Sequence, residues 1–96
     1  MHIITQKRIW EAKEKYPHSA NALDGWYRIV KGNRFNNFAE LRRTFNSVDI
    51  VGDYYIFDIG GNKLRLIARI FFENQKIFIQ DILTHAEYDK HKFTKK

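Results

Sequence analysis

The chain has 96 residues, a length that suits one domain and leaves no room for a second hydrophobic core. Hydrophobic residues make up 44% of it and aromatic residues 16%, which favours a packed core over a disordered chain. It contains no cysteine, which excludes a disulfide framework, a catalytic thiol and a cysteine-based zinc site. No apolar run reaches the roughly 20 residues of a membrane span, and the N-terminus lacks a signal-peptide core, so we expect a cytoplasmic protein that does not bind a membrane.

The charge balance is basic. Seventeen Lys and Arg residues against eleven Asp and Glu give a net charge of +6. Such an excess favours a polyanionic partner, which includes nucleic acid, the ribosome, an anionic membrane or an acidic protein. Net charge alone does not distinguish among these partners, so the positions of the cations in the fold are needed to identify the class of partner.

The first third of the sequence predicts a short strand followed by two helices. Residues 1–4 read as the strand, Thr5 as a helix N-cap, and Pro17 as the residue that ends the first helix. Ser19 is the expected cap of the second helix and Gly32 its expected C-terminal cap. The apolar stripe of this second helix is formed by Leu23, Trp26, Tyr27 and Val30. Two helices joined by a proline-containing turn predict an antiparallel helical hairpin.

A third, short helix is indicated after a polar loop. Asn37 and Glu40 have the spacing of a capping box, and the helix is expected to reach about Thr44. Its apolar anchors are Phe38, Leu41 and Phe45. Residues 47–52 are expected to be irregular or weakly extended.

The second half of the chain predicts an antiparallel sheet. Residues 53–59 read as a strand, and Gly60-Gly61 as a two-residue hairpin turn that pairs Asp58 with Lys63. Alternation along the two strands then gives an apolar face, expected to pack on the helical hairpin, and a second face, expected to be open. The apolar face contains Tyr55, Phe57, Leu64, Leu66, Ala68, Ile70 and Phe72. The second face contains Tyr54, Ile56, Asp58, Lys63, Arg65, Ile67, Arg69 and Phe71.

A third strand is predicted over residues 76–84. Pairing Phe72 with Ile77 sets its register. The register places Gln80 beside Arg69, Thr84 beside Arg65, and Ile77, Ile79 and Leu83 on the core face. It also places Asp81 on the core face, where an unpaired carboxylate is costly. Either the strand has a bulge near Asp81, or this carboxylate caps a group at the sheet edge.

Lys63, Arg65 and Arg69 project from the second face and form what we call the basic strip. Arginine offers paired planar donors to phosphate oxygens and lysine adds a point charge, so the strip is a candidate phosphate-binding surface. The alternative is a solvated outer face on which Lys63 is paired with Asp58 across the hairpin.

His85 and Tyr88 follow the third strand. In a helical turn they would share a face, and histidine is the usual proton shuttle near neutral pH. Beside the arginines they could serve RNA cleavage, with the histidine moving a proton, the arginines stabilising the phosphorane and the tyrosine stacking on a base. The alternative is that Thr84 caps a last helical turn and His85 is a surface residue.

The remaining residues offer less chemistry. His2, His18 and His91 are scattered, and no metal-ligand spacing is recognisable, so neither a metal nor a cofactor is expected. The C-terminal residues 88–96 form a basic tail. Its Lys90 and Lys92 would contact RNA, or the tail would only be a frayed end.

Four motifs in order resemble the HigB toxins of bacterial toxin–antitoxin pairs, over essentially the whole chain. They are the opening MHIITQK, the central GGNKLRLIA, the turn FFENQK and the ending THAEYD. The resemblance implies a RelE-like α+β fold, with a small antiparallel sheet packed against an N-terminal helical hairpin. It also implies ribosome-dependent cleavage of mRNA, and a HigA-type helix-turn-helix antitoxin through which alone the toxin would contact operator DNA.

The matching site positions are Asn62, Lys63, Arg65, Arg69, His85 and Tyr88. The expected reaction is attack of a ribose 2′-hydroxyl on the adjacent phosphate, without a metal. Two alternatives stay open. One is a non-catalytic module that binds RNA or the ribosome, and the other is an interaction domain whose basic face only meets an acidic antitoxin.

Overall fold

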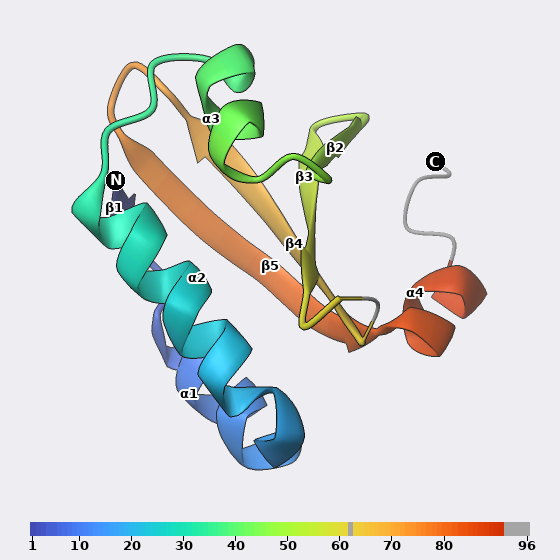
Figure 1. Ribbon diagram of the computed structural model, residues 1–96. Helices are drawn as coiled ribbons and strands as arrows, with labels where there is room; N and C mark the ends of the chain where they lie inside the picture. The colour runs from blue at the N-terminus through green and yellow to red at the C-terminus, as the bar shows by residue number, and fades with distance from the viewer. Residues whose placement is uncertain (62, 92–96) are drawn as a thin grey trace.

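The computed structural model describes residues 1–61 and 63–91, which fold into one mixed sheet with helices packed against it (Figure 1). The strands are β1 (His2–Ile3), β2 (Asp49–Val51), β3 (Tyr54–Ile59), β4 (Leu64–Phe71) and β5 (Lys76–Thr84). The helices are α1 (Lys7–Lys15), α2 (Ala20–Gly32), α3 (Phe38–Thr44) and α4 (His85–His91), with a 3₁₀ turn over Pro17–Ser19. This is the predicted α+β class. No described helix is long and apolar enough to cross a bilayer.

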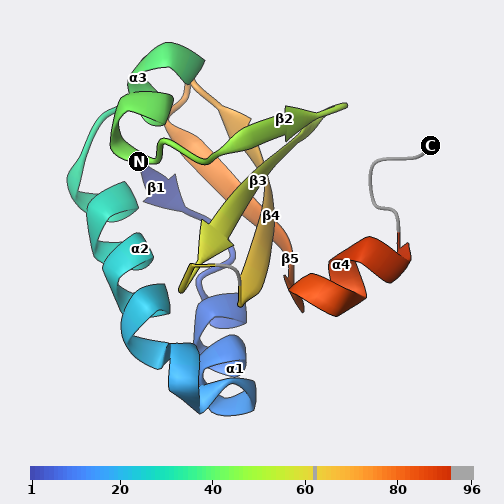
Figure 2. The ribbon, with the colours of Figure 1, turned by 45° about the vertical axis from the view of Figure 1, so that its right-hand side comes forward.

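The strand order is β1-β5-β4-β3-β2. Strands β3, β4 and β5 are antiparallel as expected, and β2 adds to β3 in the antiparallel direction. Strand β1 pairs with β5 in parallel, a pairing that no local sequence pattern indicates. The segment 47–52, expected to be irregular or weakly extended, contains β2. Turned by 45°, the ribbon shows α1 and α2 along one side of the sheet and α4 beyond the end of β5 (Figure 2).

The main core lies between the sheet and the helical hairpin, as predicted. Phe57 and Leu66 of the apolar face are buried in the same cluster as Leu23 and Trp26 of α2. The rings of Trp26 and Phe57 meet edge to face with their centroids 5.4 Å apart, a favoured geometry for aromatic pairs. Burial of this face therefore holds α2 against β3 and β4.

The expected cap at Thr5 is wrong. Gln6 precedes α1, and the Thr5 hydroxyl instead donates to the carbonyl of Ile79 and accepts from its amide. This hydroxyl satisfies backbone groups on the edge of β5 just beyond the end of β1. Ser19 does occupy the N-cap position of α2, but its side chain makes no cap hydrogen bond.

Gly32 is not a left-handed C-terminal cap. It is the last residue of α2 and does not have a positive φ, and the side-chain Nδ2 of the next residue, Asn33, donates to the carbonyl of Ile29 at 2.7 Å. The short helix α3 matches its prediction in both bounds and cap. The Asn37 side chain accepts from the Glu40 amide at 2.9 Å.

The β3–β4 hairpin has a longer loop than predicted. Ile59 pairs with Leu64 and Asp58 with Arg65, so residues 60–63 lie between the strands and Lys63 belongs to the loop. Gly60 and Gly61 both have positive φ, which glycine adopts at no steric cost. The pairing differs from the predicted one by two residues. An even difference leaves every side chain on its predicted face.

A β-bulge interrupts β5, which confirms one of the two alternatives offered for Asp81. Ala68 pairs with Ile79 and Ile67 with Asp81, so Gln80 is an extra residue without a partner in β4. The rest of the predicted register is wrong. The observed pairs are Ile77 with Ile70, Phe78 with Arg69, and Leu83 with Arg65. The predicted pairs do not form; these were Phe72–Ile77, Gln80–Arg69 and Thr84–Arg65.

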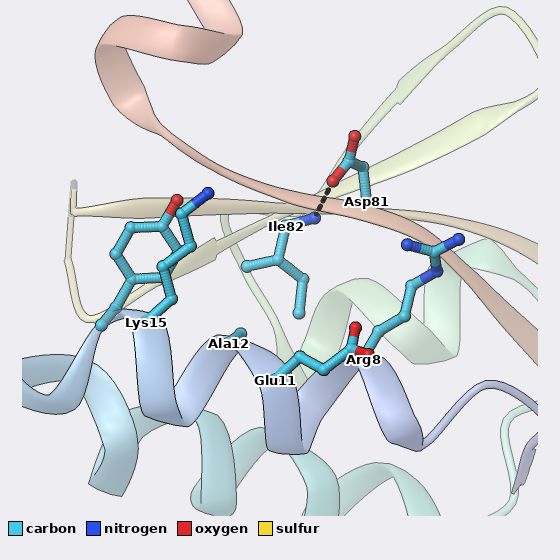
Figure 3. Close-up of a pocket in the computed structure, with 7 residues that line it drawn as sticks. Arg8, Glu11, Ala12, Lys15, Asp81 and Ile82 are labelled. Carbon is cyan, nitrogen blue, oxygen red and sulfur yellow. Dashed lines mark hydrogen bonds between the residues drawn. The ribbon is translucent and has the colours of Figure 1, made fainter.

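The bulge changes which face each later side chain meets. Ile82 points toward α1 and joins the main core, whereas Asp81 lies on the other side of the strand and accepts a hydrogen bond from the Ile82 amide (Figure 3). Leu83, predicted on the core face, belongs to a second cluster with Ile56 and Ile67. The extra residue thus keeps the carboxylate out of the core.

Replacing Leu66 by alanine tests the core assignment. The side chain is fully buried, so we expect the Leu66→Ala variant to lose about 2–5 kcal/mol of unfolding free energy. Denaturant unfolding measures the loss. The matched control is Ile50→Ala, because Ile50 is 42% exposed on β2. A loss below about 0.5 kcal/mol for Leu66→Ala, within the range of surface substitutions, would contradict the assignment.

Candidate active site under α4

The second face of the sheet is not open along its whole length. Ile56, Ile67 and Leu83 form a small buried cluster there, and Tyr88 of α4 packs against it. The expectation of an open face is therefore wrong for the part of the face that α4 covers. The bulge in β5 explains the difference, because it turns Leu83 to this face and so provides the apolar surface against which α4 packs.

A reciprocal capping box begins α4. The Glu87 amide donates to the Thr84 hydroxyl at 3.1 Å, and the Glu87 carboxylate accepts from the Thr84 amide at 3.0 Å. The hydrogen bond from the Thr84 amide lowers the pKa of Glu87. The Tyr16 hydroxyl donates to the same carboxylate at 3.3 Å, which links α4 to the end of α1. Thr84 thus caps the last helix, which confirms the part of the alternative interpretation that assigned this residue a capping role.

Arg65 lies between a carboxylate and an imidazole. Its Nε is 3.3 Å from Oδ1 of Asp58, its partner across the hairpin, and its Nη2 is 2.7 Å from Nδ1 of His85. The Arg65 side chain is 12% exposed and that of Asp58 is 30% exposed. Asp58 therefore pairs with Arg65, and not with Lys63 as the solvated-face alternative had it.

His85 starts α4 beside the hairpin loop. Its amide donates to the carbonyl of Lys63 at 3.2 Å, and its Nε2 is 3.3 Å from Oδ2 of Asp89 one turn further on. Half of the His85 side chain is exposed, and 63% of Asp89. Asp58, Arg65, His85 and Asp89 thus form a continuous chain of polar contacts, which we call the arginine–histidine network.

Tyr88 borders this network with one part of its ring buried. Burial raises the pKa of its phenol, and the neighbouring carboxylate of Asp49 raises it further, while Arg65 acts in the opposite direction. The phenol is therefore neutral at physiological pH. It can donate a hydrogen bond or stack on a base, but it is not a base in its own right.

The basic strip is divided in two. About 13 Å of strand separates Arg69 from Arg65, with the buried Ile67 between them. Arg69 is exposed and its guanidinium lies 5.7 Å from the centroid of Phe71. Lys63 is exposed in the hairpin loop, close to the network only through its backbone.

Of the three residues predicted to bind RNA, the structure describes only Lys90. Lys90 is exposed on α4. Asn62 and Lys92 lie outside the described residues. Within the described ranges, no group of three or more histidine and acidic side chains could hold a metal ion.

Sequence reasoning missed the acidic members of the site. The i, i+4 spacing of His85 and Asp89 on a helix could have identified Asp89. Asp49 reaches the neighbourhood of Tyr88 through β2, whose pairing opposite Ile56 had no sequence signal.

Comparison with known proteins places this site in a family. A family model described as the HigB toxin, the RelE-like toxic component of a toxin–antitoxin system, matches residues 19–91. The chain belongs to the HigB toxin family. An mRNA interferase HigB of Escherichia coli O6:H1 is 42% identical over 93 residues, which cover 94% of this chain and 90% of the relative. The mRNA interferase toxin HigB of Escherichia coli K12 is 39% identical over 92 residues, with 93% and 88% covered.

The family match extends from the residue before α2 to the end of α4, and so includes every member of the arginine–histidine network. As the toxic component of a toxin–antitoxin system, a HigB toxin has a cognate antitoxin as its partner.

Removing the cap at Thr84 should loosen α4. We expect Thr84→Ala to lower the stability of this helix by about 0.5–2 kcal/mol, because the Glu87 amide loses its acceptor. Hydrogen exchange of the α4 amides measures the change. Thr84→Ser keeps the hydroxyl and is the matched control. Unchanged protection in Thr84→Ala would mean that Tyr88 packing alone holds the helix.

Acid should loosen the same helix. A carboxylate whose pKa is lowered by folding stabilises the fold at pH values above its ordinary pKa of 4.5, and this contribution is lost as pH falls through the lowered value. We therefore expect the α4 protection factors of the parent to fall below pH 4.5. In Glu87→Gln this pH dependence should disappear. Identical acid profiles for the two proteins would contradict the role of Glu87.

Proposed function

We propose that this HigB toxin is a metal-independent endoribonuclease that cleaves mRNA on the ribosome, with Arg65 and His85 at its catalytic centre. The observation that carries the proposal is the exposed 2.7 Å contact between Arg65 Nη2 and His85 Nδ1, at the end of the sheet where β5 leads into α4. A phosphate-binding cation and a proton-transfer group in direct contact are the two elements that this reaction needs. Both relatives described above are named mRNA interferases, which supports the same activity.

In the proposed reaction, the ribose 2′-oxygen attacks the adjacent phosphorus. The 2′-hydroxyl gives up its proton, the P–O5′ bond breaks, and the departing 5′-oxygen takes up a proton. The products are a 2′,3′-cyclic phosphate and a free 5′-hydroxyl, so no water or cofactor is consumed. His85 exchanges the proton, and the guanidinium of Arg65 offsets the negative charge that develops on the phosphorane.

The other candidate residues have supporting roles. The neutral phenol of Tyr88 stacks on a base or donates to the phosphate, and Arg69 binds a phosphate further along the strand. Lys63 and Lys90, together with Asn62 and Lys92, contact the RNA backbone. A toxin with so few catalytic groups relies on the ribosome to orient the message.

The proposal extends to partners and organisation. The cognate antitoxin is of the HigA type with a helix-turn-helix, and operator DNA is contacted only through the toxin–antitoxin complex. Residues 1–96 act as a single toxin domain in the cytoplasm, where ribosomes translate, and the segment 88–96 contributes basic side chains.

Replacing His85 tests the reaction directly. We expect His85→Ala to slow single-turnover cleavage on programmed ribosomes by about 10²–10⁴, the usual contribution of a positioned proton-transfer group. Ribosome affinity should not change. The matched control is His18→Ala, an exposed histidine in the turn before α2. Cleavage by His85→Ala at the parental rate would assign the proton transfers to Lys63 or to ribosomal groups.

Primer extension separates the enzyme from a binding module. Messages from cells that express the parent should show defined cleavage sites. Stalled but intact messages would indicate a non-catalytic protein that binds RNA or the ribosome.

Arg69 tests whether the far half of the basic strip takes part. Because this side chain is exposed, we expect Arg69→Ala to abolish growth inhibition without lowering thermal stability. The logarithm of its binding constant for a 2′-O-methyl oligoribonucleotide should also depend less steeply on the logarithm of the salt concentration. The slope should become smaller in magnitude by about 0.7, the value for one lost phosphate contact on a single strand. Full toxicity with an unchanged slope would show that Arg69 is a surface residue without a role in RNA binding.

A further inference from the structure

We infer that Asp89 is a positioning residue that fixes the tautomer of His85, and that Arg65 occupies the basic nitrogen of His85 until an RNA phosphate draws the guanidinium away. The inference deepens the proposed function and rests on it for the part that concerns RNA. The part that concerns the free toxin depends only on the arginine–histidine network.

The tautomer follows from the chemistry of arginine. A guanidinium has only donors, so the nitrogen that meets Arg65 Nη2 at 2.7 Å must present a lone pair. His85 Nδ1 is therefore unprotonated and the ring proton lies on Nε2. Nε2 is 3.3 Å from Oδ2 of Asp89, a carboxylate that can only accept and so favours a proton on this nitrogen. The two contacts select the same tautomer.

The same contacts leave the imidazole without an available lone pair. Nδ1 is engaged by Arg65, and Nε2, which lies 3.3 Å from Oδ2 of Asp89, carries the ring proton. His85 can accept the proton of a 2′-hydroxyl only after Arg65 leaves Nδ1. The free toxin thus holds its base in a masked state.

A phosphate is the ligand that can remove the mask. A phosphate offers the guanidinium an anionic acceptor and can take two of its hydrogen bonds in parallel, whereas the neutral imidazole offers a single lone pair. Asp58 contacts Nε, and Nη1 donates to the carbonyl of Leu64 at 3.4 Å. Rotation of the planar guanidinium about the Cδ–Nε bond moves Nη2 away from His85 while Nε stays beside Asp58. The departure of Nη2 would free Nδ1 beside the phosphate that Arg65 has just bound.

Other charged groups near His85 are already engaged elsewhere. Glu87 accepts from Thr84 and Tyr16, and Lys63 meets His85 through its carbonyl. Asp89 is therefore the carboxylate placed to orient the ring.

Nitrogen NMR of toxin labelled with ¹⁵N-histidine tests the inference on the free protein. At neutral pH, His85 should show the Nε2–H tautomer with an unprotonated Nδ1. In Asp89→Ala the Nε2 proton should lose its protection from exchange, whereas in Glu14→Ala, an exposed acid on α1, it should not. An Nδ1–H tautomer in the parent, or identical spectra for Asp89→Ala and the parent, would overturn the positioning role.

Addition of a 2′-O-methyl oligoribonucleotide, which cannot be cleaved, then tests the mask. The Nδ1 resonance of His85 should shift on binding in the parent but not in Arg65→Gln, where no guanidinium is present to leave. A bound oligonucleotide that leaves the parental Nδ1 resonance unmoved would overturn the masking role of Arg65.

Single-turnover cleavage on programmed ribosomes gives the kinetic readout. The orienting aspartate of a serine protease triad contributes about 10⁴ to kcat, and for the more exposed Asp89 we expect a loss of about 10- to 100-fold in the rate of Asp89→Ala, with ribosome affinity unchanged. Asp89→Glu, which restores a carboxylate, should recover part of the rate. A parental rate in Asp89→Ala while His85→Ala remains slow would reject this inference and leave the proposed function standing. Parental rates in both variants would instead reject the role of His85 itself.

Discussion

The extra residue at Gln80 determines which face of the sheet every later side chain of β5 meets. If β5 continued through Gln80 without a bulge, alternation along the strand would place Asp81 and Leu83 on the side of the main core. The backbone around the bulge is satisfied by side chains. The Thr5 hydroxyl bonds both backbone groups of Ile79, and the Asp81 carboxylate accepts from the next amide. The bulge is thus supported from both sides and has a defined structural role.

The position of the catalytic candidates depends on this bulge. Leu83 on the second face completes the apolar cluster under Tyr88, and Thr84 then caps the helix that His85 begins. His85 therefore arrives within hydrogen-bond distance of an arginine from the neighbouring strand. Two aspartates, one on β3 and one on α4, hold the outer ends of this pair. The same acids reduce the positive charge of this edge, so the site is better described as a paired network than as an open basic strip.

The sequence was sufficient for the features that depend on local patterns. The bounds of α3 and β5, and the apolar face and its packing on α2, follow from periodicity, capping residues and alternation. Arg65 and His85 do meet, as expected from the place of His85 directly after β5, although the predicted pair Thr84–Arg65 does not form. The pairing registers were not predictable in the same way, because they depend on loop length and on the bulge. The partner of Asp58 changed from Lys63 to Arg65 when the loop proved two residues longer. The parallel pairing of β1 and the approach of Asp49 to Tyr88 join distant segments, which no local pattern records.

The central claim is that one phosphate engages Arg65 and thereby exposes the lone pair of His85. The most direct measurement is a structure of the toxin on a ribosome programmed with mRNA that carries a 2′-O-methyl group at the cleavage site. We expect the Arg65 guanidinium to contact the scissile phosphate and Nδ1 of His85 to face the blocked 2′-oxygen, while Asp89 remains beside Nε2. A scissile phosphate bound elsewhere on the toxin, with the contact between Arg65 and His85 still intact, would contradict it.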